Sequence, residues 1–334
     1  MKIENLPFCL PCAKGGRFAK GKLGGIVFTF YSKILFSLFF ILRSLAETTT
    51  LYNINYNQKG ISMHQKKIAV ISDISGFGRC SITVSLPIIS AFGIQCCPLP
   101  TAVLSNHSGY PDFFFDDYTD RMEIYMDMWS KLELTFDGIL TGFLGSSKQI
   151  DIVLEFIRRF KTPDTMLIVD PVMGDNGRLY STYTPELAKD MTRLCTQADI
   201  IMPNLTEACV LADMPYQEQF HSADYARLCD RLQALGPKNI VLTGLLTPST
   251  VGNYIREPGQ ADHILRRRLS GQPRAGTGDV FASVVAADQV KGNSFAGSVA
   301  KAADFVQTTI RRSEELQIPA EDGVCFEEFL TQLR

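Results

Sequence analysis

A short glycine-rich segment near the C-terminus, Arg274-Ala275-Gly276-Thr277-Gly278-Asp279, precedes an apolar run with helical spacing. Gly276 and Gly278 allow backbone conformations that other residues rarely adopt, and the first amides of a helix have no helical acceptor. Those amides and the helix dipole favour a bound anion. Asp279 directly follows the turn, where a carboxylate can accept the proton of an alcohol that attacks a phosphoryl group. The segment therefore predicts a phosphate-binding turn with a general base, although alone it also fits an ordinary glycine turn.

Two further acids follow other predicted strands. Asp170 opens the segment Asp170–Asp175 after an apolar run, and Glu207 ends Pro203-Asn204-Leu205-Thr206-Glu207 after the next apolar run. Carboxylates from adjacent strand ends suit a hydrated Mg²⁺, which takes one or two of them together with phosphate oxygens. Each acid alone could instead cap a turn or a helix. Beside the glycine turn, a magnesium site is the favoured interpretation.

Elements that would position these groups alternate along the chain from residue 66. Short apolar runs predict strands at 67–71, 95–99, 138–141, 166–169, 200–202 and 239–243, with a late antiparallel addition at 251–254 and 263–267. Amphipathic stretches predict helices at 81–92, 119–134, 147–160, 185–195, 204–212, 223–235, 279–291 and 295–312. This order predicts one doubly wound domain, a three-layer α/β/α sandwich with a mostly parallel sheet. Ligands of such sheets bind beyond the carboxyl ends of the strands, where the polar and glycine clusters fall.

Composition narrows the class of protein. The chain has 334 residues, 46% of them hydrophobic, and a net charge of −2. Basic residues concentrate in the first 60 positions, so the remainder is acidic, which argues against a nucleic-acid partner. Nine cysteines without regular spacing indicate reduced thiols. We therefore expect a cytoplasmic enzyme that acts on a small molecule.

Together the motifs resemble the ribokinase-like superfamily and, within it, the vitamin B6 kinases, over residues 66–334. The segment 276–279 is similar to the catalytic signature of the superfamily, and 170–175 and 203–207 are similar to its metal and phosphate motifs. The block Ser105-Asn106-His107-Ser108-Gly109-Tyr110 resembles the Ser-Asn-His-Thr block that marks the B6 kinases and is the most discriminating match.

The resemblance implies a role for each matching residue. Asp279 would activate the 5′-hydroxyl of the vitamer, and the amides of Gly276, Thr277 and Gly278 would stabilise the transferred phosphate. Mg²⁺ would be organised by Asp170 and Glu207, with Asp175 as a further candidate. Contacts with ATP are implied for Thr243, Gly244, Asn204 and Tyr180, the last in a flap over residues 175–183. The vitamer pocket would be lined by Ser72, His107, Ser108 and Phe143. ATP and Mg²⁺ are the expected cofactors, with a monovalent cation left open, and a homodimer is the expected assembly.

Some positions depart from the B6 pattern and keep alternatives open. Phe143 and Ser108 stand where the family often has Tyr and Thr, so the preferred vitamer is not determined. The turn Gly76-Phe77-Gly78-Arg79 resembles that of hydroxymethylpyrimidine kinases, which keeps the pyrimidine alcohol of thiamine synthesis as an alternative substrate. A non-catalytic vitamin-binding protein is a second alternative, but such a protein would not need Asp279.

The N-terminal segment is interpreted separately. Residues 25–42 are apolar apart from Lys33 and follow basic residues, so this stretch could be a membrane span or a signal sequence. No small-residue cleavage site follows it, and an ATP-using enzyme needs the ATP supply of the cell interior. We favour a third interpretation, in which translation starts at Met63. The expected organisation is an N-terminal extension over 1–62 and a kinase domain over 63–334 without a membrane contact.

Overall fold

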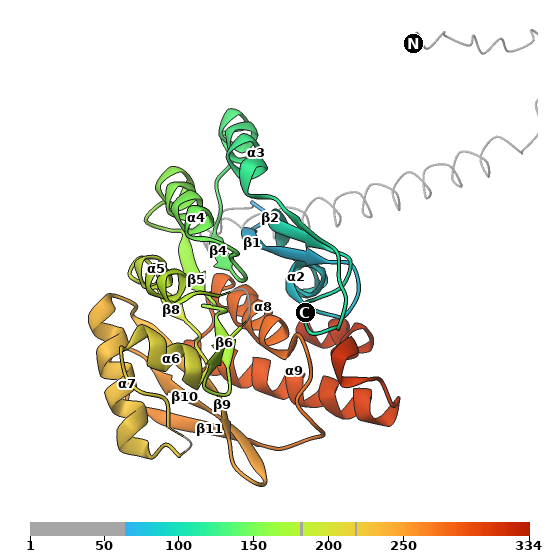
Figure 1. The fold of residues 1–334 in the computed structure, drawn as a ribbon, viewed down its shortest axis with the longest axis vertical. Coiled ribbons are helices and arrows are strands. Elements are labelled where there is room, and N and C mark those ends of the chain that lie inside the picture. Colours follow the sequence, from blue (N-terminus) through green and yellow to red (C-terminus); the bar gives the residue numbers. More distant parts are fainter. Residues whose placement is uncertain (1–63, 181–182, 218) are drawn as a thin grey trace, which may run out of the picture. The chain divides into compact units, whose positions relative to one another are not determined.

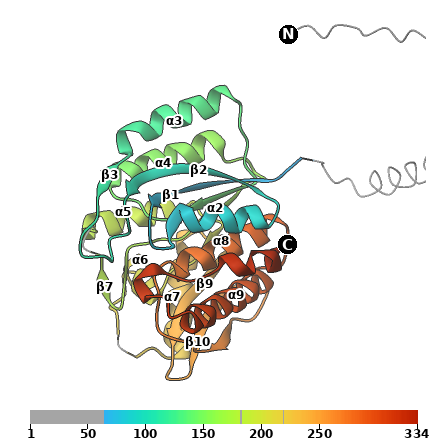
Figure 2. The ribbon, with the colours of Figure 1, turned by 90° about the vertical axis from the view of Figure 1, so that its right-hand side faces the viewer.

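A nine-stranded sheet forms the middle layer of the computed structural model, which describes residues 64–180, 183–217 and 219–334 (Figures 1 and 2). Its strand order is β11-β10-β9-β8-β5-β4-β1-β2-β3. The strands from β9 to β2 in this order are parallel, whereas β10, β11 and β3 are antiparallel additions at the two edges. The strands are β1 (Lys67–Ser75), β2 (Gln95–Leu104), β3 (Phe115–Asp117), β4 (Gly138–Thr141), β5 (Met166–Val169), β8 (Ile200–Ile201), β9 (Asn239–Leu246), β10 (Thr250–Arg256) and β11 (His263–Arg268).

Helices cover both faces of this sheet. One face carries α2 (Ser81–Ala91), α8 (Thr277–Val290) and α9 (Phe295–Glu315). The other carries α3 (Thr119–Lys131), α4 (Ser147–Phe160), α5 (Pro185–Cys195), α6 (Leu205–Leu211) and α7 (Ser222–Leu235). The predicted three-layer α/β/α sandwich with a mostly parallel sheet is therefore confirmed.

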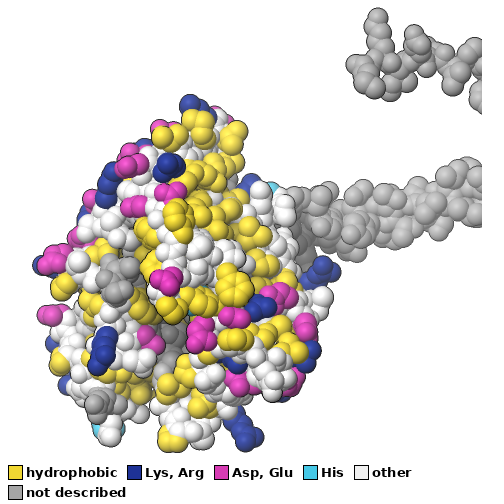
Figure 3. Space-filling model, turned by 45° about the vertical axis from the view of Figure 1, so that its right-hand side comes forward, with side chains coloured by type: hydrophobic (Ala, Val, Ile, Leu, Met, Phe, Trp, Pro, Cys, Tyr) yellow, Lys and Arg dark blue, Asp and Glu magenta, His cyan; other side chains and the backbone are white. Residues whose placement is uncertain are grey.

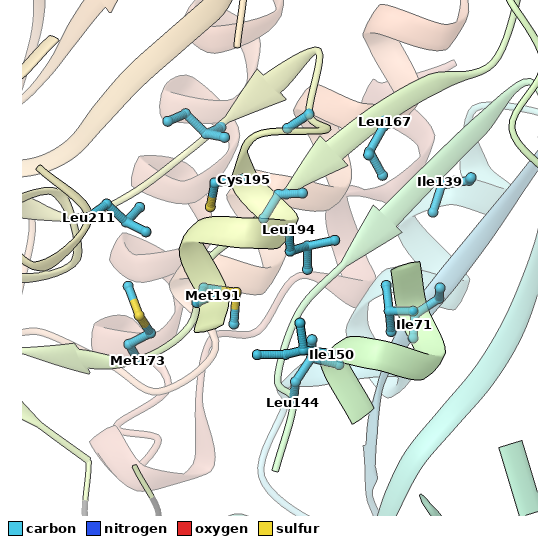
Figure 4. Packing of buried hydrophobic residues seen from close by; sticks show 14 of the residues in the cluster. Ile71, Ile139, Leu144, Ile150, Leu167, Met173, Met191, Leu194, Cys195 and Leu211 are labelled. Atoms are coloured by element: carbon cyan, nitrogen blue, oxygen red, sulfur yellow. The ribbon is translucent and has the colours of Figure 1, made fainter. Parts of the chain in front are cut away.

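Each face of the sheet has its own hydrophobic core. The core under α4 and α5 includes Ile139 and Leu167 from the sheet and Met191 and Leu194 from α5 (Figure 4). The core under α2 and α8 includes Val70 from β1, Ile168 from β5 and Val284 from α8. Helix α8 is buried along nearly its whole length, which explains why its sequence is apolar on all sides.

The alternation of side chains along the strands decides where the site faces. Successive residues of a strand point to opposite faces, so a residue two positions after a core residue points the same way. Ser72 follows Val70 by two positions, and Asp170 follows Ile168 by two. Both side chains are therefore directed to the α8 side of the sheet.

Several elements were not predicted from the sequence. Strand β2 continues through Pro98 and Pro100, although proline has no amide to donate. There β2 pairs with β1 alone, because β3 pairs only with residues 102–104, and an edge position tolerates proline. The elements missing from the prediction are short: the edge strand β3, the hairpin β6 (Gly174–Asp175) and β7 (Arg178–Leu179), and the 3₁₀ helices η1 (Ala320–Asp322) and η2 (Glu327–Leu333).

Gln65–Arg334 form one compact unit. Within the described residues, no helix is both long enough and apolar enough to cross a membrane. The predictions made for residues 1–62, including the apolar stretch 25–42 and the start at Met63, concern positions outside the described residues.

Candidate active site

A pocket lies where the strand order changes direction. From β1 the chain passes to β2 on one side and later to β4 on the other, which makes the β1–β4 crevice the switch point where ligands of such sheets bind. Its polar lining includes Ser72, Asp170 and Asp279, together with Ser85 and Thr141. The structure therefore brings together three residues that the sequence assigned to acceptor, metal and base.

The glycine turn at the start of α8 is fixed by steric contact on one side and open on the other. Gly276 has a φ of 69°, and a Cβ placed on it would lie 1.8 Å from the carbonyl oxygen of Arg79. A Cβ on Gly278 would meet nothing within 4 Å. No side chain caps the first turn of α8, so its amides are available to an anion in the open space beside Gly278.

Asp279 lies in this first turn and has the properties of a base. Burial is the largest cause that raises the pKa of its carboxyl to about 7, and the nearby Asp73 adds to it. A hydrogen bond from the Ser81 amide acts in the opposite direction. A carboxylate whose pKa lies near neutral pH is well matched to accepting a proton from an alcohol.

Asp170 and Glu207 add two more acids to the same region. Burial and the proximity of Asp279 raise the pKa of Asp170 to about 8. Burial and the proximity of Asp170 raise the pKa of Glu207 well above its usual value. The described residues contain no cluster of three or more His, Cys, Asp or Glu that could hold a metal by itself. Two mutually repelling carboxylates beside an anion-binding turn nevertheless fit a hydrated Mg²⁺, which needs few protein ligands and would relieve the repulsion.

Glu207 also caps α6. Its Oε1 accepts from the Met173 amide at 3.1 Å, and its Oε2 accepts from the Asn204 amide at 2.8 Å. The side chain of Asn204 accepts from the Glu207 amide at 3.0 Å and donates to the Gly174 carbonyl at 2.8 Å. The helix-cap interpretation of Glu207 is thus correct as a description of its contacts, and it leaves the carboxylate rigidly placed. The side chain of Asn204 would therefore have to make the predicted contact with ATP in addition to these two hydrogen bonds, or in place of one of them.

The predicted ATP contacts lie within β9, beyond the residues that pair with β8. The amide of Thr243 donates to the Pro203 carbonyl at 2.9 Å, which ties this part of β9 to the loop before α6. Gly244 has a φ of +71°, and a Cβ there would meet nothing within 4 Å. The backbone is therefore open to a ligand at this point, and the role of both residues stays a prediction.

The predicted flap contains the β6–β7 hairpin. Asp175 is exposed, and its carboxylate accepts from the amide and the side chain of Asn176 at 2.8 and 3.1 Å. Burial and the charges of Glu207, Asp175, Asp170 and Asp279 raise the pKa of Tyr180, which places its phenol close to the acids of the site. Tyr180 is nonetheless 45% exposed, so it lies at the rim of the acid cluster.

The residues predicted to line the vitamer pocket differ in burial and in the hydrogen bonds that they already make. Ser72 is buried, and its Oγ accepts from the Phe143 amide at 3.2 Å. The Nδ1 of His107 accepts from the Gly109 amide at 3.1 Å, so its Nε2 carries the proton and donates to the Glu321 carbonyl at 2.7 Å. Ser108 is exposed. The crevice pocket is lined by Ser72 and not by His107, Ser108 or Phe143, whose roles stay predictions.

Two charged residues of the site were not assigned from the sequence. Asp73 is 5% exposed, accepts from Ser75 Oγ at 2.9 Å and contacts Ser72 Oγ at 3.4 Å. It thus orients Ser72 and repels Asp279. Arg274 is buried directly before the glycine turn. Their positions next to predicted site residues were the only sequence signal for either.

Comparisons with known proteins agree with this geometry. The profile of the phosphomethylpyrimidine kinase family matches residues 124–324. A solved structure from Bacteroides thetaiotaomicron, described as a phosphomethylpyrimidine kinase, is 39% identical, with a TM-score of 0.79 over 82% of this chain and 96% of its own. A second crystal structure with the same description, also 39% identical, is of an orthorhombic form with pyridoxal.

Pyridoxal kinases are also similar to this chain. The Arabidopsis thaliana pyridoxal kinase is 26% identical over 236 residues, which cover 67% of this chain and 73% of the plant protein. The crystal structure of the Lactobacillus plantarum pyridoxal kinase is 27% identical, with a TM-score of 0.75 over 81% of this chain and 97% of its own.

Proposed function

The chain belongs to the phosphomethylpyrimidine kinase family, and from this premise we propose that it is a vitamin B6 kinase. It transfers the γ-phosphate of ATP to the 5′-hydroxymethyl group of pyridoxal, pyridoxamine or pyridoxine. The observation that carries this proposal is the pocket in which Asp279, beside the open glycine turn, shares one crevice with Ser72 and Asp170. Similarity to pyridoxal kinases supports the B6 vitamer as acceptor.

The reaction follows from the chemistry of these groups. The carboxylate of Asp279 accepts the proton of the hydroxymethyl group while that oxygen forms its bond to the γ-phosphorus. The bond from the γ-phosphorus to the bridging oxygen breaks, and ADP leaves with the electron pair. The amides at Gly276–Gly278 stabilise charge on the transferred group. Mg²⁺, which Asp170 and Glu207 would hold, supplies charge neutralisation on the phosphates when bound.

The hydroxymethylpyrimidine of thiamine synthesis, or its phosphate, is the second candidate acceptor, because the matching family is described as phosphomethylpyrimidine kinase. Side-by-side turnover of pyridoxal, pyridoxamine, pyridoxine, hydroxymethylpyrimidine and hydroxymethylpyrimidine phosphate with ATP separates the two. We expect a B6 vitamer to give the highest kcat/KM. Faster turnover of the pyrimidine would keep the kinase and replace the acceptor, whereas tight vitamer binding without ADP formation would favour the non-catalytic alternative.

We also propose a cytoplasmic homodimer. The described cysteines are free, which suits a reducing compartment. Ile124 on α3 and Leu132 at its C-cap are 62% and 67% exposed and lie about two helical turns apart, with Met128 between them. Hydrophobic side chains are visible at the surface in the upper part of Figure 3, where α3 lies. Light scattering of the wild type and of Met128→Lys tests the assembly, since a dimer that uses this helix would become a monomer in the variant.

A further inference from the structure

One segment near the C-terminus, Ile318–Gly323, contacts three loops of the site. The carbonyl of Glu321 accepts from His107 Nε2 at 2.7 Å, and the carboxylate of Asp322 accepts from Tyr110 Oη at 2.6 Å. The Asp322 carbonyl accepts from the Arg79 amide at 3.3 Å. The Ala320 carbonyl accepts from the Ala275 amide at 3.2 Å. The loop before α2, the loop that carries His107 and the loop that leads into the glycine turn therefore all contact this one segment.

Arg274 fastens this segment to the glycine turn. Its side chain is 1% exposed, and its Nη1 donates to the carbonyls of Ile318, Pro319 and Gly323 at 2.8, 3.2 and 3.4 Å. Its Nη2 donates to Glu314 Oε1 at 2.7 Å. A planar guanidinium can serve several acceptors at once in this way, whereas an ammonium cannot match the geometry. None of these four acceptors belongs to α8 or to the sheet.

Steric contacts make the support rigid. Gly323 has a φ of +83°, and a Cβ there would lie 2.9 Å from the Arg79 carbonyl oxygen and 3.3 Å from that of Ala275. Gly276 approaches the same Arg79 carbonyl from the other loop. The glycine turn and the C-terminal segment are therefore packed against one backbone atom, so a shift of one displaces the other.

From these contacts we propose that Arg274 is a positioning residue of phosphoryl transfer. Through the segment Ile318–Gly323, it keeps the anion-binding amides of Gly276–Gly278 at a fixed position relative to the loop that carries His107. The assignment deepens the proposed function and rests on it for the identity of the acceptor. Misplacement of a catalytic group by about 1 Å can cost about 10²-fold in rate, so a residue that contacts neither substrate can still control kcat.

Arg274→Ala and Arg274→Lys test the proposal, with Arg267→Ala as the matched control. Arg267 pairs with Asp304 at the surface and contacts none of these loops. We expect kcat per folded molecule to fall about 10- to 10²-fold in Arg274→Ala, with KM for ATP within about threefold. Millimolar guanidinium should restore part of that kcat by occupying the vacated space, and should not affect Arg267→Ala. If Arg274→Ala folds poorly, Arg274→Lys still tests the proposal. We expect its kcat to be about three- to tenfold below that of the wild type, and guanidinium should not restore it.

A wild-type kcat in both folded Arg274 variants, or a loss that guanidinium never restores in Arg274→Ala, would overturn the assignment. Amide hydrogen exchange separates its failure from that of the proposed function. Tyr110→Phe removes the hydrogen bond to Asp322. Faster amide exchange at residues 276–278 in this variant would support the coupling between the His107 loop and the glycine turn, even in a protein that phosphorylates no B6 vitamer. Unchanged exchange at these residues in an active enzyme would refute this coupling and leave the kinase assignment standing.

Discussion

The α-carbon of Gly276 faces the carbonyl oxygen of Arg79 so closely that a Cβ at this position would lie 1.8 Å from it. Gly276→Ala must therefore shift the backbone of one of two loops, and its left-handed φ adds about 1–2 kcal/mol of strain. We expect a clear drop in Tm together with loss of turnover. Thermal unfolding and ADP formation measure the two effects.

Gly278→Ala is the informative partner of that variant. Its Cβ meets nothing within 4 Å and its φ is not positive, so the free energy of unfolding should change little. The added methyl group would enter the open space beside the amides, so kcat should fall while Tm stays near the wild-type value. An active Gly278→Ala enzyme would argue against phosphate binding at this turn.

Asp279→Asn should lower kcat by about 10²- to 10⁴-fold, the usual contribution of positioned proton transfer. ATP binding should remain, because the amides of the turn are unchanged. Equilibrium binding of a fluorescent ATP analogue, measured beside turnover, distinguishes this outcome from unfolding. Turnover close to that of the wild type would exclude Asp279 as the base.

The raised pKa of Asp279 also predicts how stability depends on pH. Its carboxyl titrates near 3.8 when unfolded and near 7 in the folded protein, so the folded state holds the proton more tightly between these values. The Asp279 contribution to the free energy of unfolding is therefore present at low pH and declines as the pH rises through about 7. Asp279→Asn lacks this decline, so without Mg²⁺ it should gain stability relative to the wild type between about pH 5 and about pH 8.5. Urea unfolding at both pH values checks the sign, and an equal difference at the two would contradict it.

Asp170→Asn and Glu207→Gln test the magnesium site. Each variant removes one negative charge, so half-maximal activity should require a higher Mg²⁺ concentration. Each replacement also removes a buried charge, but a Gln amide cannot accept from both the Met173 and Asn204 amides, so Glu207→Gln should gain about 1 kcal/mol less unfolding free energy than Asp170→Asn. Titration of activity with Mg²⁺, at fixed K⁺ and then without it, measures this dependence and any need for a monovalent cation. A wild-type Mg²⁺ profile in both variants would leave these acids with structural roles only.

Side chains at strand ends could be predicted from the sequence because their positions depend on local pattern. The apolar runs predict where the polar side chains of Ser72 and Asp170 begin, although β1 continues past Ser72 to Ser75, and the glycine turn marks the start of α8. The hydrogen bond of His107 could not be predicted, since its partner Glu321 is 214 positions away and lies in a 3₁₀ turn without hydrophobic periodicity. The contacts of Arg274 could not be predicted either, because three of its four acceptors are main-chain carbonyls, which could belong to any residue type.

Ser72 and Asp170 each stand two positions beyond a residue of the core under α8, and this spacing limits how the gene can change. Loss or gain of one codon inside β1 or β5 would turn every later side chain of that strand to the opposite face of the sheet. The polar side chain would then point toward α4 and α5. A change of two codons would preserve the direction of the side chain and alter only its depth. Among natural variants of this enzyme, length differences inside these strands should therefore come in even numbers, while odd ones should be confined to the connecting loops.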